Sequence, residues 1–182
     1  MHSPLDPDTS MQPVELEPGL RAFACPKTGG HWIPLPSYFT WRELHGSASN
    51  PLPADYKPEL ADDSTQRALI CPESGYLLVR YRVGRGLNFS VDRSPKTGGV
   101  WLDAGEWNAL KSKGLHDELH LIFTAPYQAR MLSEAADSQL QNRFRERIGA
   151  EAFQRVAEFR MWLRNHPKRR DIVAYLLDEE GS

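Results

Sequence analysis

The sequence is poor in cysteine, has no long apolar run and carries no dominant charge. Only 2 of its 182 residues are cysteine, which excludes a disulfide framework and leaves too few thiolates for a tetrahedral zinc site. No apolar stretch approaches the ~20 residues of a membrane-spanning helix, and residues 1–8 lack the basic and apolar regions of a signal peptide. Lysine and arginine number 22 against 24 acidic residues, so no overall basic field points to nucleic acid. We therefore expect a cytoplasmic protein with no membrane partner.

Proline content and apolar spacing divide the sequence into an extended first part and a helical last part. Ten of the 14 prolines lie in the first 60 residues, which favours turns and short strands there. We expect a flexible tail at residues 1–12 and a linker at residues 46–66. Residues 67–91 have the alternation typical of strands with one solvated face. Beyond residue 123 the apolar residues recur at helical spacing with breaks at Gly149 and Pro167, which predicts three helices in residues 124–182.

A short motif occurs twice, 69 residues apart. Residues 25–32 (CPKTGGHW) match residues 94–101 (SPKTGGVW) at six of eight positions, including the proline, both glycines and the tryptophan. The likeness continues into two predicted helix starts, with Ser37 as an N-cap in the first copy and the pair Asp103 and Glu106 as a capping box in the second. The pattern indicates a duplicated turn–strand–helix unit, which we place in residues 13–45 and 67–123.

The second copy has a partner turn upstream. The sequence CPESG begins at Cys71, 23 residues before Ser94. Two C-P-x-C-G turns at this spacing, with a β-hairpin between them, build a ribbon in which four cysteines bind zinc tetrahedrally. The vestigial ligand positions in this sequence are Cys71, Ser74, Ser94, Thr97, Cys25 and Thr28.

These residues carry a resemblance to a known family. Residues 69–110, which end GGVWLDAGEWNAL, resemble the bacterial transcription-factor-IIB-type zinc-ribbon family, whose second knuckle runs C-P-x-C-G-G-x-W-L-D-x-G-E-L. Residues 25–44 resemble a second, partial copy of the same unit. The resemblance implies a zinc-ribbon fold and a nucleic acid or a protein as partner.

The ligand positions depart from that family, because three of the four positions in the second copy carry hydroxyl residues. One thiolate cannot hold zinc where four are needed, so we expect no bound metal and no cofactor. We expect Trp32 and Trp101 to cover the former metal sites, above hydrogen-bonded hydroxyls. Cys25 and Cys71 are interpreted as ordinary buried residues of turns, and residual metal binding through them with His31 or His45 stays open.

Two other polar patterns have simple structural explanations. His116 and His120 are four residues apart, but Asp117 stands where a metalloprotease helix carries its general-base glutamate. We interpret this segment as a polar helix end or turn. Helix capping accounts for Asp103 and Glu106 without acid–base catalysis. The sequence thus predicts that the protein is not an enzyme.

The only marked charge asymmetry lies in the last third. Residues 143–170 contain nine lysines and arginines against three acidic residues. This is either a solvated helix face balanced by the rest of the chain, or a surface for nucleic acid or an acidic partner. The candidate contacts are Arg143, Arg147, Arg164, Lys168, Arg169 and Arg170.

Together these patterns predict an α+β protein: two duplicated zinc-ribbon-like knuckle–strand–helix units with a helical C-terminal region, packed as one globule. The function that they favour is a non-catalytic, zinc-ribbon-derived interaction module that is metal-free and binds another protein. The alternative is a nucleic-acid-binding, zinc-ribbon-like protein that uses the basic C-terminal helices.

Overall fold

The structure, a computed structural model, describes residues 1–45 and 67–178 and divides the chain into two compact units. Unit 1 is Met1–Met131 and unit 2 is Leu132–Ser182. Unit 1 contains a sheet with short helices and unit 2 is helical in its described part, so the predicted α+β class is confirmed. The C-terminal region forms a unit of its own, and the expected packing of all parts as one globule stays a prediction. The linker expected at residues 46–66 lies outside the described residues.

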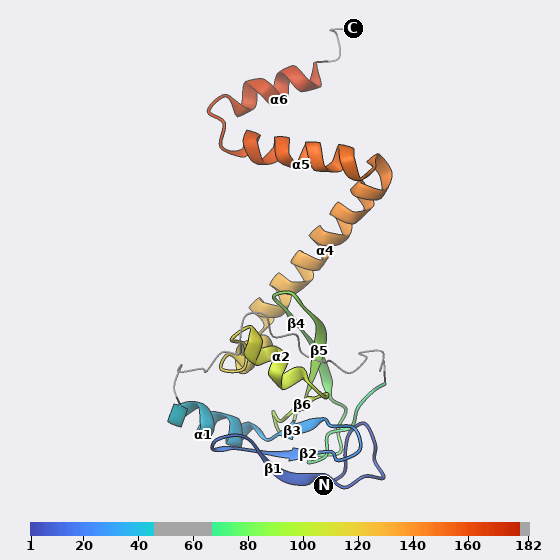
Figure 1. The fold of residues 1–182 in the computed structure, drawn as a ribbon, viewed down its shortest axis with the longest axis vertical. Helices are drawn as coiled ribbons and strands as arrows, with labels where there is room; N and C mark the ends of the chain where they lie inside the picture. The colour runs from blue at the N-terminus through green and yellow to red at the C-terminus, as the bar shows by residue number, and fades with distance from the viewer. Residues whose placement is uncertain (46–66, 179–182) are drawn as a thin grey trace. The chain divides into compact units, whose positions relative to one another are not determined.

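Unit 1 is built on a six-stranded antiparallel sheet with the order β1-β2-β3-β6-β5-β4 (Figure 1). The order is palindromic, because the chain runs from an edge strand to a central strand in each half: from β1 to β3 in the first and from β4 to β6 in the second. At the centre β3 pairs with β6, and Trp32 lies opposite Trp101. The strands are β1 (Gln12–Glu17), β2 (Leu20–Ala24), β3 (His31–Ile33), β4 (Val79–Gly84), β5 (Leu87–Arg93) and β6 (Val100–Leu102).

Each half of unit 1 continues from its central strand into a helix. The helices of this unit are α1 (Leu35–His45) after β3, α2 (Glu106–Ser112) after β6, and α3 (Leu119–Ile122). The expected N-cap at Ser37 is wrong, because α1 already begins at Leu35 and Ser37 lies inside its first turn.

One hydrogen bond of the expected capping box is present in the second copy. The Glu106 carboxylate accepts a hydrogen bond from the Asp103 N–H at 2.8 Å, as in a capping box. The Asp103 carboxylate also accepts the indole N–H of Trp101 at 2.7 Å. Residue Gly105 is the N-cap of α2 and provides no side-chain cap.

The main core of unit 1 lies between the sheet and its helices. Its fully buried members include Leu20, Ile33 and Leu102 from the strands and Leu110 from α2. The first turns of α4 (Ala125–Ile148) complete the core through Tyr127 and Met131, both buried. Apolar burial on this scale is the main stabilising contribution to such a unit.

A second, smaller core lies beside the Cys-Pro turns. It consists of Met11, Cys25, Trp32, Leu69, Cys71 and Trp101. Both indoles are almost fully buried, at 0% and 1% exposure. Each ring also fills the space above a glycine of the other copy: a Cβ on Gly30 would lie 2.3 Å from Trp101 Cζ2, and a Cβ on Gly99 would lie 2.3 Å from Trp32 Cζ2. Only glycine allows approach this close.

Residues 1–12, which were expected to form a flexible tail, instead pack within unit 1. Ser3 is 2% exposed and Met11 is 6% exposed within the second core. The Ser3 N–H donates to the Thr9 carbonyl at 2.9 Å, and the Met11 N–H donates to the Met1 carbonyl at 2.8 Å. Composition alone indicated a tail, but the prolines of this segment form a turn that is closed by backbone hydrogen bonds.

Unit 2 contains the three helices that the apolar spacing predicts. They are the greater part of α4, followed by α5 (Ala150–Arg164) and α6 (Arg169–Leu177). Gly149 separates α4 from α5 at a positive φ of 84°, and Pro167 lies between α5 and α6, where it cannot continue a helix. Figure 1 shows α5 and α6 as separate rods that reverse direction at this turn. None of the helices in the described ranges is long and apolar enough to cross a membrane.

The central tryptophan pair should dominate the stability of unit 1. We expect Trp101→Ala to lower the free energy of unfolding by about 3–5 kcal/mol, because it leaves a cavity above Gly30 and an unfilled second core. Chemical denaturation followed by circular dichroism measures this loss. The matched control is Trp162→Ala on α5, where the indole is 53% exposed and little stability should be lost. Equal unfolding midpoints for the Trp101 variant and the parent would contradict the assigned role of the pair.

Candidate functional site

Four turns that begin with Ser-Pro or Cys-Pro surround the second core; we call them the Pro turns (residues 3–9, 25–30, 71–76 and 94–99). In the turn that begins at Cys71, its N–H donates to the Tyr76 carbonyl at 2.7 Å and its carbonyl accepts from the Gly75 N–H at 2.9 Å. The turns that begin at Cys25 and Ser94 have the same two backbone hydrogen bonds at 2.8–3.0 Å. The glycine of each of these three turns has a φ of 71–75°.

The predicted ligand positions of the second copy come together around Cys71. Its sulfur lies 3.9 Å from the Thr97 hydroxyl, and the Ser94 hydroxyl accepts the Thr97 N–H at 3.1 Å. Burial by itself would raise the pKa of the Cys71 thiol, but the nearby hydroxyls of Ser74 and Ser94 and the amides of its own turn outweigh burial and lower that pKa. The four side chains thus form one small polar group, in which Cys71 and Ser94 are buried and Ser74 and Thr97 are half-buried.

Cys25 and Thr28 form a corresponding group in the first copy. The Thr28 hydroxyl accepts the Gly30 N–H at 3.4 Å, as Thr97 does for Gly99. The pKa of the Cys25 thiol is also lowered, because hydrogen bonds from Ser3, from Thr28 and from turn amides outweigh the effect of burial.

Two members of this first group were missed at the sequence level. Ser3 begins the upstream Pro turn, and the Asp6 N–H lies 3.4 Å from the Ser3 hydroxyl. The Asp6 carboxylate forms an ion pair with Lys27 at 2.6 Å. The signal that could have identified them is the Ser-Pro dipeptide 22 residues before Cys25, which parallels the 23 residues between Cys71 and Ser94.

The residues of these two groups are a poor set of metal ligands. Within residues 1–45 and 67–178, no three His, Cys, Asp or Glu side chains converge in a way that could hold a metal ion. His45 was considered as an additional ligand, but its Nδ1 lies 2.9 Å from the Trp41 carbonyl and its ring stacks on Trp41. Serine and threonine hydroxyls are weak zinc ligands, and here they hold the backbone of their own turns.

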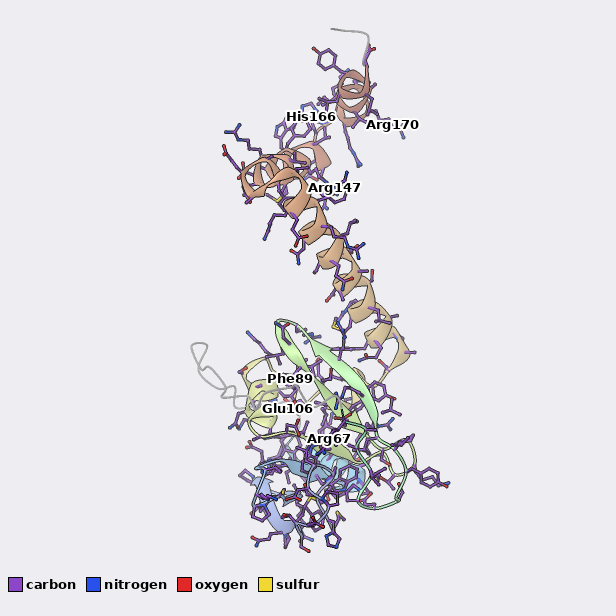
Figure 2. The ribbon with its side chains drawn as sticks, turned by 90° about the vertical axis from the view of Figure 1, so that its right-hand side faces the viewer. Arg67, Phe89, Glu106, Arg147, His166 and Arg170 are labelled. Atoms are coloured by element: carbon purple, nitrogen blue, oxygen red, sulfur yellow. The ribbon has the colours of Figure 1, made fainter. Side chains whose placement is uncertain are left out.

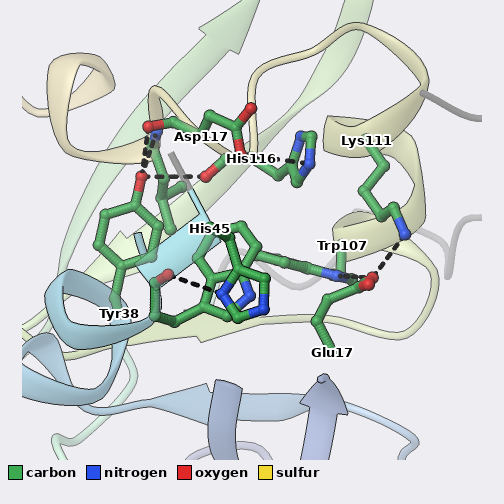
Figure 3. Close-up of polar contacts among 9 residues, drawn as sticks. Glu17, Tyr38, His45, Trp107, Lys111, His116 and Asp117 are labelled. Atoms are coloured by element: carbon green, nitrogen blue, oxygen red, sulfur yellow. Dashed lines mark hydrogen bonds and ion pairs between the residues drawn. The ribbon is translucent and has the colours of Figure 1, made fainter. Parts of the chain in front are cut away.

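A buried cluster of aromatic and polar side chains connects the two copies on the helix side of the sheet (Figure 3). Glu17, at the end of β1, accepts hydrogen bonds from the Trp107 indole at 3.0 Å and from Lys111 Nζ at 2.6 Å. The Tyr38 hydroxyl on α1 donates to the carbonyls of the 116–117 segment at 2.8–2.9 Å and accepts the Leu119 N–H at 3.1 Å. These bonds fix α1 against the segment between α2 and α3.

His116 is the most enclosed titratable group in this cluster. It lies in the turn before α3, as predicted, but its ring is only 2% exposed and contacts Trp41 and Trp107. Burial lowers the pKa of His116, Asp117 partly opposes this effect, and Lys111 adds to it. Its Nδ1 has no hydrogen-bond partner among the described residues. The imidazole is therefore held neutral as part of the packing.

The predicted basic contacts all lie exposed on unit 2. Figure 2 shows Arg147 on α4 and Arg170 on α6. Lys168 forms an ion pair with Asp171 at 3.8 Å. The remaining candidates are Arg143 on α4, Arg164 at the end of α5 and Arg169 at the start of α6.

The same helices expose large apolar side chains. Trp162 is 53% exposed, Leu140 is 54% exposed and Tyr175 is 81% exposed. Single exposed apolar residues are common on protein surfaces, but a contiguous set of them marks an interaction site. The exposed members of unit 2 are Leu132, Leu140, Phe144, Ile148, Val156, Phe159, Met161, Trp162, Val173, Tyr175, Leu176 and Leu177.

Comparison with protein-family models, with curated proteins and with solved structures gives no match to this chain. The features of the molecule that bear on function are therefore the geometry of the Pro turns and the surface of unit 2.

The Pro turns allow a direct test of their relation to metal sites. We expect the triple variant Ser74→Cys, Ser94→Cys, Thr97→Cys to bind one zinc ion, because it places three thiolates beside Cys71. Elemental analysis and thermal unfolding with and without a chelator measure binding. The control adds Cys71→Ser, which removes one ligand and should weaken zinc binding by an order of magnitude or more. A triple variant that folds but does not bind zinc would show that the turns do not place these side chains in the geometry of a zinc site.

His116 predicts how stability depends on pH. Its folded-state pKa lies below its ordinary value of about 6.5. The unfolded chain therefore takes up a proton first, so stability should fall as the pH drops below about 6.5 and toward the folded-state pKa. Unfolding midpoints measured from about pH 8 to about pH 5 report this slope. His116→Gln should reduce this slope and leave the part that comes from His31 and His120, whose pKa values burial also lowers. His2→Gln, at an exposed position, should leave the slope unchanged.

Proposed function

We propose that this protein is a non-catalytic interaction module, derived from a zinc ribbon and metal-free, that binds another protein through the helices of unit 2. The observation that carries the proposal is the exposure of large apolar side chains on α4, α5 and α6. Neither α5 nor α6 has a single buried residue. An amphipathic helix gains most of its stability from burying its apolar face, so these helices need a partner surface.

The derivation from a zinc ribbon is supported by the Pro turns. Three of them share one backbone hydrogen-bond pattern, and the residues at the four former ligand positions of the second copy lie around one sulfur. The palindromic strand order places the two copies side by side through β3 and β6. A pair of ribbon units with a shared aromatic core has a source of stability other than the ion.

A non-catalytic role is supported by what the polar residues do. The groups that resemble catalytic pairs are engaged in structure: Glu106 receives the Asp103 N–H, and His116 packs between two tryptophans. Both thiols are buried members of the second core, together with Trp32 and Trp101.

The alternative function is nucleic-acid binding through the basic residues of unit 2. The observation that favours it is the excess of nine basic over three acidic residues in residues 143–170. A protein that neutralises six phosphates of a DNA duplex would show a salt slope of about −5, at roughly −0.9 per phosphate. Protein binding through apolar contacts has a much weaker dependence on salt.

The test is affinity capture of partners from a nuclease-treated lysate of the cells that produce the protein. We expect a protein that is retained by the parent and lost with Phe144→Ser/Trp162→Ser, because these changes remove exposed apolar contacts without touching a core. The control is Arg143→Ser/Arg147→Ser on α4, which should retain the protein. The alternative would replace this proposal if two results were found together. Nuclease treatment would remove all captured material, and direct binding to duplex DNA would show a salt slope near −5.

A further inference from the structure

Unit 2 contains a groove between its last two helices. The groove has a volume of about 420 Å³ and is lined mainly by residues of α5 and α6. Its apolar lining, which we call the floor, includes Phe153 and Val156 from α5 and Val173 from α6. Val156 is 49% exposed and Val173 is 36% exposed, so the floor is open to a ligand.

The groove also has a basic lining, which we call the rim. It consists of Arg160, Arg164 and Arg169. None of these three guanidinium groups forms an ion pair with another side chain of the described part of the chain, whereas neighbouring Arg155 pairs with Glu151 at 2.7 Å. Arginine binds carboxylates through a planar fork of donors, so the rim presents unsatisfied donors around an apolar floor.

The charge of this region selects among possible occupants. A second copy of unit 2 would bring residues 143–170, with their nine basic and three acidic residues, against the same basic surface, and like charges oppose that contact. A nucleic acid would pair with the arginines but would leave Val156 and Val173 without an apolar counterpart. A helix with one apolar face and acidic flanks satisfies both the floor and the rim.

We propose that the groove between α5 and α6 binds an acidic amphipathic helix of a partner protein. This inference rests on the proposed function and specifies the chemistry of the partner. Apolar side chains of the partner helix would cover Phe153, Val156 and Val173, and its glutamate or aspartate residues would pair with Arg160 and Arg164. Electrostatic attraction of this kind mainly sets orientation and the rate of association, while the apolar contacts provide affinity.

The experiment uses the full chain and three labelled synthetic peptides of about 20 residues, or roughly six helical turns. The first peptide has a leucine stripe flanked by glutamate, the second has the same stripe flanked by lysine, and the third keeps the glutamates but replaces the leucines with serine. Fluorescence anisotropy at near-physiological salt measures binding, with an unlabelled DNA duplex as competitor. We expect the first peptide to bind at least about tenfold more tightly than the other two.

Charge reversal in the groove provides the specific test. Arg160→Glu/Arg164→Glu should weaken the glutamate-flanked peptide by about tenfold or more and should allow the lysine-flanked peptide to bind instead. The matched control, Arg143→Glu/Arg147→Glu, changes the same net charge on α4 outside the groove lining and should change binding only about twofold. A folded groove variant that gains the lysine-flanked peptide excludes misfolding as the cause.

Three results would overturn the proposal. In the first, the glutamate-flanked and lysine-flanked peptides bind equally well. In the second, the groove variant and the control variant lose the same affinity for the glutamate-flanked peptide, and in the third, the DNA duplex binds more tightly than the peptide and depends on Arg160 and Arg164 in the same way. If the peptides fail while affinity capture still returns a protein that depends on Phe144 and Trp162, the proposed function stands and only this partner class is rejected. If capture also fails, the proposed function is rejected with it.

Discussion

The reciprocal packing of two tryptophans against two glycines is the contact on which unit 1 depends. Trp32 lies over Gly99 and Trp101 lies over Gly30, each with no room for a Cβ between ring and backbone. Because each ring belongs to one copy and each glycine to the other, the contact requires both copies and the register of β3 with β6. Structural zinc contributes about 10–16 kcal/mol in small zinc-finger peptides. A buried aromatic pair with a shared sheet is a physical substitute for part of that contribution.

The polar residues beneath this pair follow from the same arrangement. A buried hydroxyl or thiol needs hydrogen-bond partners, and the backbone of their own turn provides them for Ser94 and Thr97, whereas the buried Ser74 hydroxyl has no partner among the described residues. Ser94 is fully buried and accepts N–H groups of its own turn. The Trp101 indole donates to Asp103, and the Trp32 indole donates to Glu73 of the other copy at 3.1 Å. The three turns that begin at Cys25, Cys71 and Ser94 thus share one backbone hydrogen-bond pattern although they present few metal ligands.

Unit 2 differs from unit 1, because many of its large apolar side chains are exposed. Phe159 and Trp162 stack at 5.4 Å between ring centroids, and Trp162 contacts His166 at 4.7 Å, yet no residue of α5 is buried. Helical periodicity was sufficient to predict these helices, since apolar spacing is a local property. Periodicity could not distinguish a stripe that faces a core from a stripe that faces solvent, because that difference depends on which surfaces pack against it.

The sequence by itself determined the local features of this protein. The repeated CPKTGG and SPKTGG segments predicted turns of one kind, and Gly149 and Pro167 predicted where the last helices separate, because such residues restrict the backbone directly. Only the tertiary structure decided the rest: that Ser3 belongs with Cys25, that residues 1–12 pack rather than move freely, and that Trp32 pairs with Trp101. These contacts join residues distant in the chain, and their register depends on shape complementarity between two buried surfaces rather than on any local preference of the backbone.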